Sequence, residues 1–399
     1  MFLSAMEIRR RLAAVNPQVY EPDLATTQND LGILYSDTRR YGDSEEMFLS
    51  VMEIRRRLVA ANPQVYEPDL AMVQNNLGCL YDNTQRYEES GEMYLSVMEI
   101  YRRLAAANPQ VYEPDLAMTQ NNLGTLYYNT QRYEDSEKMY LSVMEIYRRL
   151  AAVNPQVYEP DLATIQNNLG ILYSDTQRYE DSEKMYLSAM EIRRRLAAAN
   201  PQVYEPDLAD TQYNLGCLYY NIQRYEDSEK MYLSAMEIRR RLAAANPQVY
   251  EPDLAGIQNN LGCLYDNTQR YEESGEMYLY AMEIYRRLAA ANPQVYEPGL
   301  VRACNNLSCL FLVQGNFEEA ERYAREGAKY DSTHHTIYTN LAASLLFQGR
   351  YAEAEEIYLR YKEELKEDFL SDFEDFYQRG IIPPEREDDV ERIKKLLSK

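Results

Sequence analysis

Asn154-Pro155-Gln156-Val157-Tyr158-Glu159-Pro160 spells NPQVYEP, a heptapeptide that occurs seven times in this chain of 399 residues. The copies begin at Asn16, Asn62, Asn108, Asn154, Asn200, Asn246 and Asn292. Each step is 46 residues, and the sequence between the copies repeats with them. Self-similarity at a fixed period of roughly 20–50 residues is typical of repeat arrays. The chain is therefore predicted to be built from stacked units that each contact their neighbours.

Composition and charge exclude several classes of protein. No apolar run reaches the length that crosses a membrane, and residues 1–15 carry charge where an export signal needs an apolar segment. The five cysteines form no CxxC pair, which favours reduced thiols in the cytoplasm over disulfides or a zinc site. A net charge of −22 argues against nucleic acid as a partner and permits a neutral or basic protein.

One unit predicts two helices. Leu116, Leu123, Leu126 and Tyr127 recur at helical spacing, so a first helix is expected over residues 114–129. A second helix is expected from residue 133 up to Asn154, where the Asn-Pro sequence stops it. On this interpretation NPQVYEP is a connector in which Asn-Pro ends one helix and Glu-Pro begins the next.

The spacing of small and aromatic residues resembles a known family. Gln120, Leu123, Gly124 and Tyr127, followed by Ser136 and Tyr140, are similar to the tetratricopeptide pattern W-x₂-L-G-x₂-Y…A-x₃-F. The 46-residue form is similar to the elongated repeats of kinesin light chains and their bacterial relatives. The resemblance implies an all-α, right-handed superhelical solenoid of antiparallel helix pairs.

The register of the repeats changes near the end of the chain. Asn306-Leu307-Ser308 and Asn340-Leu341-Ala342 lie 34 residues apart, which is the ordinary tetratricopeptide period. Residues 1–15 align with residues 47–61, so the chain starts within a repeat. We expect a truncated N-terminus, and the alternative is a native start on an unpaired helix that needs a cap. The expected organisation is a partial repeat (1–21), six 46-residue repeats (22–298), two 34-residue repeats (299–366) and C-terminal capping helices (367–399).

The last segment carries an apolar stripe of its own, formed by Phe369, Phe373, Phe376 and Tyr377. A cap that closes the last repeat is the favoured interpretation of this stripe. A docking helix for a partner is the alternative.

No catalytic or metal-binding constellation stands out. The histidines, His334 and His335, are adjacent at an expected helix start. Cys79 shares its slot in the repeat with Ile33 and Thr125, so the slot is not specific for a thiol. We therefore expect neither an enzyme nor a cofactor or metal site.

The informative positions are those that differ between copies. Three slots of the first helix vary and fall on one face, because their offsets of 0, 7 and 10 residues match the helical period. The first slot holds Thr26, Met72, Met118, Thr164, Asp210, Gly256 and Arg302. The second holds Ile33, Cys79, Thr125, Ile171, Cys217, Cys263 and Cys309. The third holds Ser36, Asp82, Tyr128, Ser174, Tyr220, Asp266 and Leu312. We call these positions the variable stripe, and the resemblance to tetratricopeptide repeats places it in a concave groove.

Asparagine pairs run beside the variable stripe. They are Asn75-Asn76, Asn121-Asn122, Asn167-Asn168, Asn259-Asn260 and Asn305-Asn306, with Asn29-Asp30 and Tyr213-Asn214 as variants. Because an amide both donates and accepts, these residues are predicted to clamp the backbone of a bound peptide while the stripe selects its side chains. The alternative is that they hydrogen-bond neighbouring helices within the protein. A further varying position on the second helix (Arg55, Tyr101, Tyr147, Arg193, Arg239 and Tyr285) is open between groove floor and packing.

The predicted function is a non-catalytic protein-interaction scaffold that binds a peptide segment. Two alternatives remain: the sensor portion of a longer signalling protein with an effector domain upstream, and a self-assembling array. The sequence leaves the partner, the oligomeric state and the choice between an extended and a helical ligand open.

Overall fold

The computed structural model describes residues 2–330 and 336–398, and this part of the chain is helical with no strand. His334 and His335 lie outside the described residues. The chain divides into two compact units, Met1–Leu196 and Ala197–Lys399, which we call unit 1 and unit 2 and describe separately.

Helices of one length recur along most of the chain. The helices that reach into or lie within unit 1 are α1 (Phe2–Val15), α2 (Pro17–Asp37), α3 (Tyr41–Ala61), α4 (Pro63–Asn83), α5 (Tyr87–Ala107), α6 (Pro109–Asn129), α7 (Tyr133–Val153), α8 (Pro155–Asp175) and α9 (Tyr179–Ala199). Those of unit 2 are α10 (Pro201–Asn221), α11 (Tyr225–Ala245), α12 (Pro247–Asn267), α13 (Tyr271–Ala291), α14 (Pro293–Val313), α15 (Phe317–Tyr330), α16 (Ile337–Phe347), α17 (Tyr351–Arg360), α18 (Lys362–Gln378) and α19 (Glu387–Leu397). A 3₁₀ turn, η1 (Pro384–Arg386), precedes α19.

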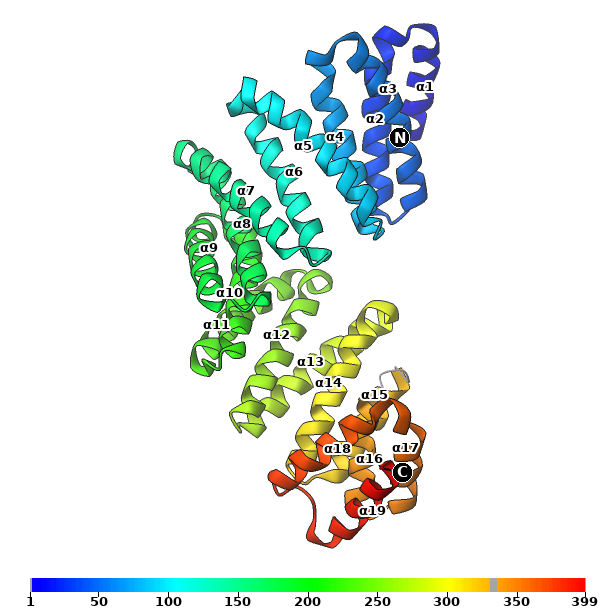
Figure 1. The fold of residues 1–399 in the computed structure, drawn as a ribbon, viewed down its shortest axis with the longest axis vertical. Helices are drawn as coiled ribbons and strands as arrows, with labels where there is room; N and C mark the ends of the chain where they lie inside the picture. The colour runs from blue at the N-terminus through cyan, green and yellow to red at the C-terminus, as the bar shows by residue number, and fades with distance from the viewer. Residues whose placement is uncertain (1, 331–335, 399) are drawn as a thin grey trace. The chain divides into compact units, whose positions relative to one another are not determined.

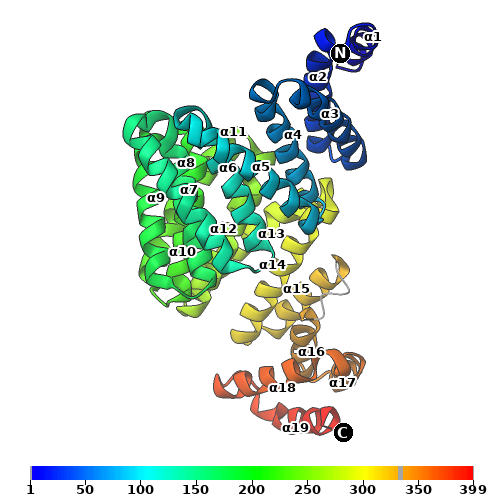
Figure 2. The ribbon, with the colours of Figure 1, turned by 45° about the horizontal axis from the view of Figure 1, so that its top comes forward.

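Consecutive helices pack as antiparallel neighbours within each unit (Figure 1). In unit 1, α2 packs on α3 and α3 on α4, and in unit 2 the same succession runs from α10 to α15 (Figures 1 and 2). The first helices of neighbouring repeats also contact one another, as α2 contacts α4 and α12 contacts α14. The predicted fold class of helix pairs in a repeat array is confirmed.

The structure corrects the role of NPQVYEP. α7 ends at Val153 and α8 begins at Pro155, so the junction between them is the single residue Asn154. Pro155 occupies the first helical position, where the missing N–H would have no partner in any case. Pro160, expected to start the helix, lies inside it, where it deprives only the Gln156 carbonyl of its usual donor. NPQVYEP is therefore the beginning of each first helix, and these helices start about one and a half turns earlier than predicted.

The turn within each repeat explains why its polar residues vary so little. Gln85 adopts a left-handed backbone conformation with a φ of 60°, which allows the tight reversal between α4 and α5. The next residue, Arg86, stacks on the Tyr81 ring at 4.0 Å and pairs with Glu45 of the preceding repeat at 2.9 Å. The guanidinium thus links two repeats while it stays half exposed, so this constancy has a structural cause.

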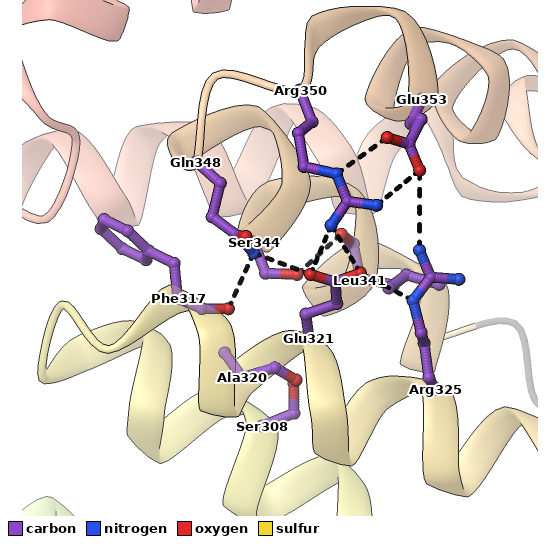
Figure 3. A network of polar contacts seen from close by, with 10 residues as sticks. All are labelled: Ser308, Phe317, Ala320, Glu321, Arg325, Leu341, Ser344, Gln348, Arg350 and Glu353. Atoms are coloured by element: carbon purple, nitrogen blue, oxygen red, sulfur yellow. Dashed lines mark hydrogen bonds and ion pairs between the residues drawn. The ribbon is translucent and has the colours of Figure 1, made fainter.

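The last repeats keep this design with shorter second helices. α14 has the full 21 residues, whereas α15 has 14. Gly315 and Gly349 supply the left-handed turn position that Gln85 occupies earlier. Figure 3 shows Arg350 bridging Glu321 and Glu353 at 2.7 and 2.6 Å, which ties α17 to α15.

The apolar stripe of the C-terminal segment packs into the core of unit 2. Phe369, Phe373 and Phe376 of α18 are buried in a cluster with residues of α16, α17 and α19. Tyr377 departs from the prediction, because 68% of it is exposed. The stripe is thus occupied by the chain's own core, which supports a capping role over a docking helix.

Candidate functional site

The variable stripe lies along the first helices, and its first slot faces solvent. Met72 and Met118 are each 42% exposed, and Ile33 of the second slot is 40% exposed. These three residues lie on α2, α4 and α6 of unit 1, whose neighbours contact one another. Exposed apolar side chains on successive repeats are a feature of interaction surfaces.

The first slot is coupled to the varying residue of the second helix. The pairs are Thr26 with Arg55, Met72 with Tyr101, Met118 with Tyr147, Thr164 with Arg193, Asp210 with Arg239, and Gly256 with Tyr285. In these six repeats a polar residue in the stripe accompanies arginine, and methionine or glycine accompanies tyrosine. The side chains meet in space, since the Arg55 guanidinium donates to the Thr26 hydroxyl at 3.3 Å.

The arginines of this coupled position are buried, which settles a question that the sequence left open. Arg55 and Arg239 are each 4% exposed. Arg55 pairs with Asp69 at 2.7 Å, and Arg239 pairs with both Asp210 and Asp253. The carboxylates are about half exposed, so they reach the surface while the guanidinium stays beneath it. The varying residue of the second helix is therefore a packing residue, and its identity is matched to that of the residue in the first slot of the stripe.

The second slot is also tied to the core. The Tyr94 hydroxyl donates to the Cys79 sulfur at 3.2 Å, and the Thr125 hydroxyl lies 3.0 Å from that of Tyr140. In the repeat of Ile33 the corresponding ring is Phe48, which has no hydroxyl, whereas in the repeat of Ile171 it is Tyr186. Burial raises the pKa of the Cys79 thiol, so the thiol stays protonated at neutral pH. Part of the variation in this slot therefore follows the needs of the core.

The asparagines form a ladder between repeats, as the alternative interpretation predicted. Asn76 donates to Asn29 at 3.0 Å, Asn122 to Asn75 at 3.1 Å, and Asn168 to Asn121 at 3.2 Å. In unit 2, Asn260 donates to the Tyr213 hydroxyl at 2.8 Å, and Asn306 to Asn259 at 2.9 Å.

Burial divides these asparagine pairs. Asn75, Asn167 and Asn259 are buried, whereas Asn121 and the second members Asn76, Asn122, Asn168, Asn214 and Asn260 are partly exposed. The role of the whole set as clamps stays a prediction, and it falls on the partly exposed members.

In unit 2 the helix α18 covers the end of the variable stripe. Leu312 is fully buried in the cluster that contains Phe373 of α18, and the side chain of the α16 residue Thr339 lies beside Asp372 of α18 at hydrogen-bonding range. Burial raises the pKa of Asp372 to about 6, with repulsion from Asp368 and Asp375 adding to the effect and the Thr339 bond opposing it. The stripe of unit 2 is therefore closed at α14.

Asp372→Asn is expected to stabilise unit 2 at neutral pH. A folded-state pKa above the ordinary value means that the folded chain holds this proton more tightly than the unfolded chain. Wild-type stability therefore falls as the pH rises from about 4 to about 6, and the variant avoids that loss. Thermal unfolding followed by circular dichroism at pH 7.5 should show a gain of about 1–3 kcal/mol that disappears near pH 4. The exposed Asp388→Asn is the control, and an equal gain at both pH values would exclude ionisation as the cause.

Comparison with known proteins supports this description of the repeats. Models of the tetratricopeptide repeat match residues 24–63, 70–108, 115–195, 161–241, 254–292 and 305–368, which together make up more than half of the chain. Among curated proteins no sequence match is found. None of the helices within residues 2–330 and 336–398 is long and apolar enough to cross a membrane.

Several solved structures share the fold. BtubC (BKLC) from P. vanneervenii is 24% identical with a TM-score of 0.51, and the match covers 60% of this chain and 89% of that chain. RapI in its apo form is 15% identical with a TM-score of 0.58, covering 94% and 97%. A signal transduction ATPase with numerous domains (STAND) and a tetratricopeptide repeat sensor, from Pyrococcus horikoshii, is 16% identical with a TM-score of 0.62, covering 93% and 53%. The family models and the helix pairs agree, and the chain belongs to the tetratricopeptide repeat family.

Proposed function

We propose that the protein is a non-catalytic interaction scaffold whose first-helix layer binds a peptide segment of a partner protein. The exposed part of the variable stripe carries this proposal. Met72 and Met118 place apolar surface on neighbouring repeats, in a slot that is polar in the repeats before and after them. A repeat array offers such a surface over several units, so a peptide can contact successive repeats.

The partly exposed asparagines complete the proposed site. Each primary amide has two N–H donors and a carbonyl oxygen. Asn76 and Asn168 each donate once, to the preceding repeat, whereas Asn122 donates both to Asn75 and to the Cys79 sulfur at 3.8 Å. The carbonyl oxygens, and the second donors of Asn76 and Asn168, are suited to the backbone of a peptide beside the stripe. Asn76, Asn122 and Asn168 would act in unit 1, and Asn260 in unit 2. The net charge of −22 favours a neutral or basic partner.

The proposal is tested by selecting a displayed library of random 12-residue peptides against the full chain. Peptides that are enriched should bind the wild type, with their Kd measured by fluorescence anisotropy. Met72→Glu with Met118→Glu should weaken this binding at least tenfold, because a carboxylate replaces apolar contact at the stripe.

The matched control is Leu95→Glu with Leu141→Glu. These residues lie on the second helices α5 and α7 and are 44% and 40% exposed, close to the exposure of the two methionines. The control variant should bind like the wild type. Failure to enrich any peptide, or equal losses in both variants, would contradict the proposed function.

A second candidate is a sensor role in a signalling protein. Similarity to the STAND protein with a tetratricopeptide repeat sensor favours it at the level of fold. In that case an enriched peptide should change the assembly state of the protein, which sedimentation velocity with and without peptide would detect. An unchanged sedimentation coefficient would favour the simple scaffold.

A further inference from the structure

A second ladder of polar contacts joins the third slot of the stripe to the next repeat. In unit 1, Asp82 accepts a hydrogen bond from Asn129, and Tyr128 donates to Asp175. In unit 2, Asn267 donates to the Tyr220 hydroxyl. In each case the partner lies 47 residues later, at the end of the next first helix.

This ladder breaks at Asp266. The residue 47 positions after Asp266 is Val313, whose side chain cannot donate a hydrogen bond. The Asp266 Oδ1 atom is buried and has no hydrogen-bond partner, and the same holds for Oδ1 of Asp82, but the Asp82 carboxylate also accepts from Asn129 whereas Asp266 has Val313 at that position. Burial raises the pKa of Asp266, and the nearby Arg379 opposes the shift. A buried acceptor without a partner is costly, so a donor from a ligand would be well placed here.

Asp266 lines an open cleft of about 400 Å³ in unit 2. Its walls come from the end of α12, the start of α13, the end of α14 and the segment after α18. They consist of Asp266, Asn267, Gln269, Tyr271, Val313, Arg379 and Ile381. The cleft lies at the point where α18 closes the variable stripe, so a peptide that follows the stripe of unit 2 would end or turn at this position.

The charges of the cleft favour a cation. The Arg379 Nε atom pairs with Asp375 of α18 at 2.9 Å, so a carboxylate already compensates this guanidinium. Asp266 has Val313 in place of the amide or carboxyl partner of the earlier repeats. The carbonyl oxygens of the Asn267 and Gln269 side chains add acceptors, and Val313, Ile381 and Tyr271 supply apolar surface. An alkyl stem that ends in a cation matches this combination.

We propose that this cleft binds a lysine or arginine side chain of the partner peptide, whose cationic head pairs with Asp266 while its alkyl stem packs on Val313 and Ile381. This rests on the proposed function and names one residue type that the partner carries. A bound metal ion is a poorer match, because a single carboxylate provides too few oxygen ligands.

The site can be tested without knowledge of the partner. The probe is N-acetyl-arginine methylamide, and its uncharged comparison is the citrulline analogue of the same shape. Ligand-observed NMR titration of the full chain should show the arginine compound binding at least tenfold more tightly than the citrulline compound. Asp266→Asn should abolish this preference, because the amide keeps the shape of the side chain and removes its charge.

Two further variants test how the charges around the cleft change its affinity for the arginine compound. Arg379→Gln should tighten binding of the arginine compound about two- to fivefold, since a positive charge near the ligand is removed. Asp82→Asn is the matched control, because Asp82 holds the same slot in unit 1 with Asn129 beside it. It should leave binding unchanged. Equal binding to wild type and Asp266→Asn, or weaker binding to Arg379→Gln, would overturn the assignment.

The peptides selected against the stripe separate this inference from the proposed function. Enriched peptides should contain lysine or arginine and lose at least tenfold in affinity for Asp266→Asn. Peptides that depend on Met72 and Met118 but bind Asp266→Asn normally would contradict the cleft alone. Asp266-dependent binding of the arginine compound with no enriched peptide would contradict the scaffold role and leave the cleft standing.

Discussion

Gly262→Ala is expected to lower the free energy of unfolding of unit 2 by about 2–3 kcal/mol. A Cβ atom at this position would lie 2.6 Å from the Tyr278 ring, closer than two carbon atoms approach without displacement. Tyr278 is 3% exposed and packs among the residues of its core cluster, so the ring cannot move aside cheaply. Chemical unfolding followed by circular dichroism would measure the loss.

The control for this substitution lies in the next helix. Gly275 of α13 has ordinary contact distance, 3.4 Å, between its would-be Cβ and a flexible methyl group of Leu310. Gly275→Ala should raise stability by about 0.5–1 kcal/mol, because alanine favours the helical state. The same chemical change is thus expected to act with opposite signs at two positions. A loss of similar size at both would show that the ring contact is not the cause.

One repeat of the chain shows how a side chain in the glycine slot can be accommodated. In the following repeat Ser308 occupies the glycine slot and Ala324 the ring slot, so a larger residue faces a smaller one. The hydroxyl that Ser274 directs to the Gly262 carbonyl is supplied there from the other side, by Ser308 to the Ala320 carbonyl at 2.8 Å (Figure 3). In the background of Tyr278→Ala, Gly262→Ala should therefore cost little, and the difference gives the coupling energy of the pair.

Replacing both Asp210 and Asp253 with alanine is expected to destabilise unit 2 by about 2–4 kcal/mol. Arg239 is buried and pairs with both carboxylates, so the double variant leaves a guanidinium below the surface without a counter-charge. The estimate is at the lower end for a buried pair because the two carboxylates are about half exposed. Thermal unfolding at low and high salt would measure the effect.

A rescue variant tests whether the coupled position explains this loss. Asp210→Met with Arg239→Tyr reproduces the combination of Met118 and Tyr147, which unit 1 accommodates with Tyr147 at 7% exposure. This pair should recover most of the stability, since it removes the buried cation and fills its space with a ring. Asp210→Met alone should remain destabilising. Equal stability of the single and double variants would show that the two positions are independent.

The paired variation at these positions also changes how the stripe is interpreted. Met72 and Met118 are exposed and carry the proposed site, yet each is accompanied by a tyrosine on the second helix. A change of ligand preference at this slot would therefore require two substitutions. The Glu variants proposed for the binding test change only the exposed residue and leave Tyr101 and Tyr147 in place, so they are expected to weaken binding without creating a new preference.

The sequence by itself determined the repeat, the helix pairs and the family. A period of 46 residues with apolar positions at helical spacing has one simple solution, since each unit buries its apolar face against its neighbours. It also located the variable stripe and the apolar C-terminal segment. Both features could be found because they depend on local spacing: the stripe on the repeat period, and the C-terminal segment on the helical spacing of its aromatic residues.

Tertiary structure decided the features that depend on which partner a side chain finds. NPQVYEP contains two prolines that can each begin a helix, and the packing of the full 21-residue helix placed the start at the first of them. The asparagines were equally suited to a ligand and to one another, and the close approach of neighbouring first helices paired them within the protein. The sequence has Val313 where the earlier repeats have a polar partner for the third slot. Only the fold showed that a buried oxygen of Asp266 lies at an open cleft.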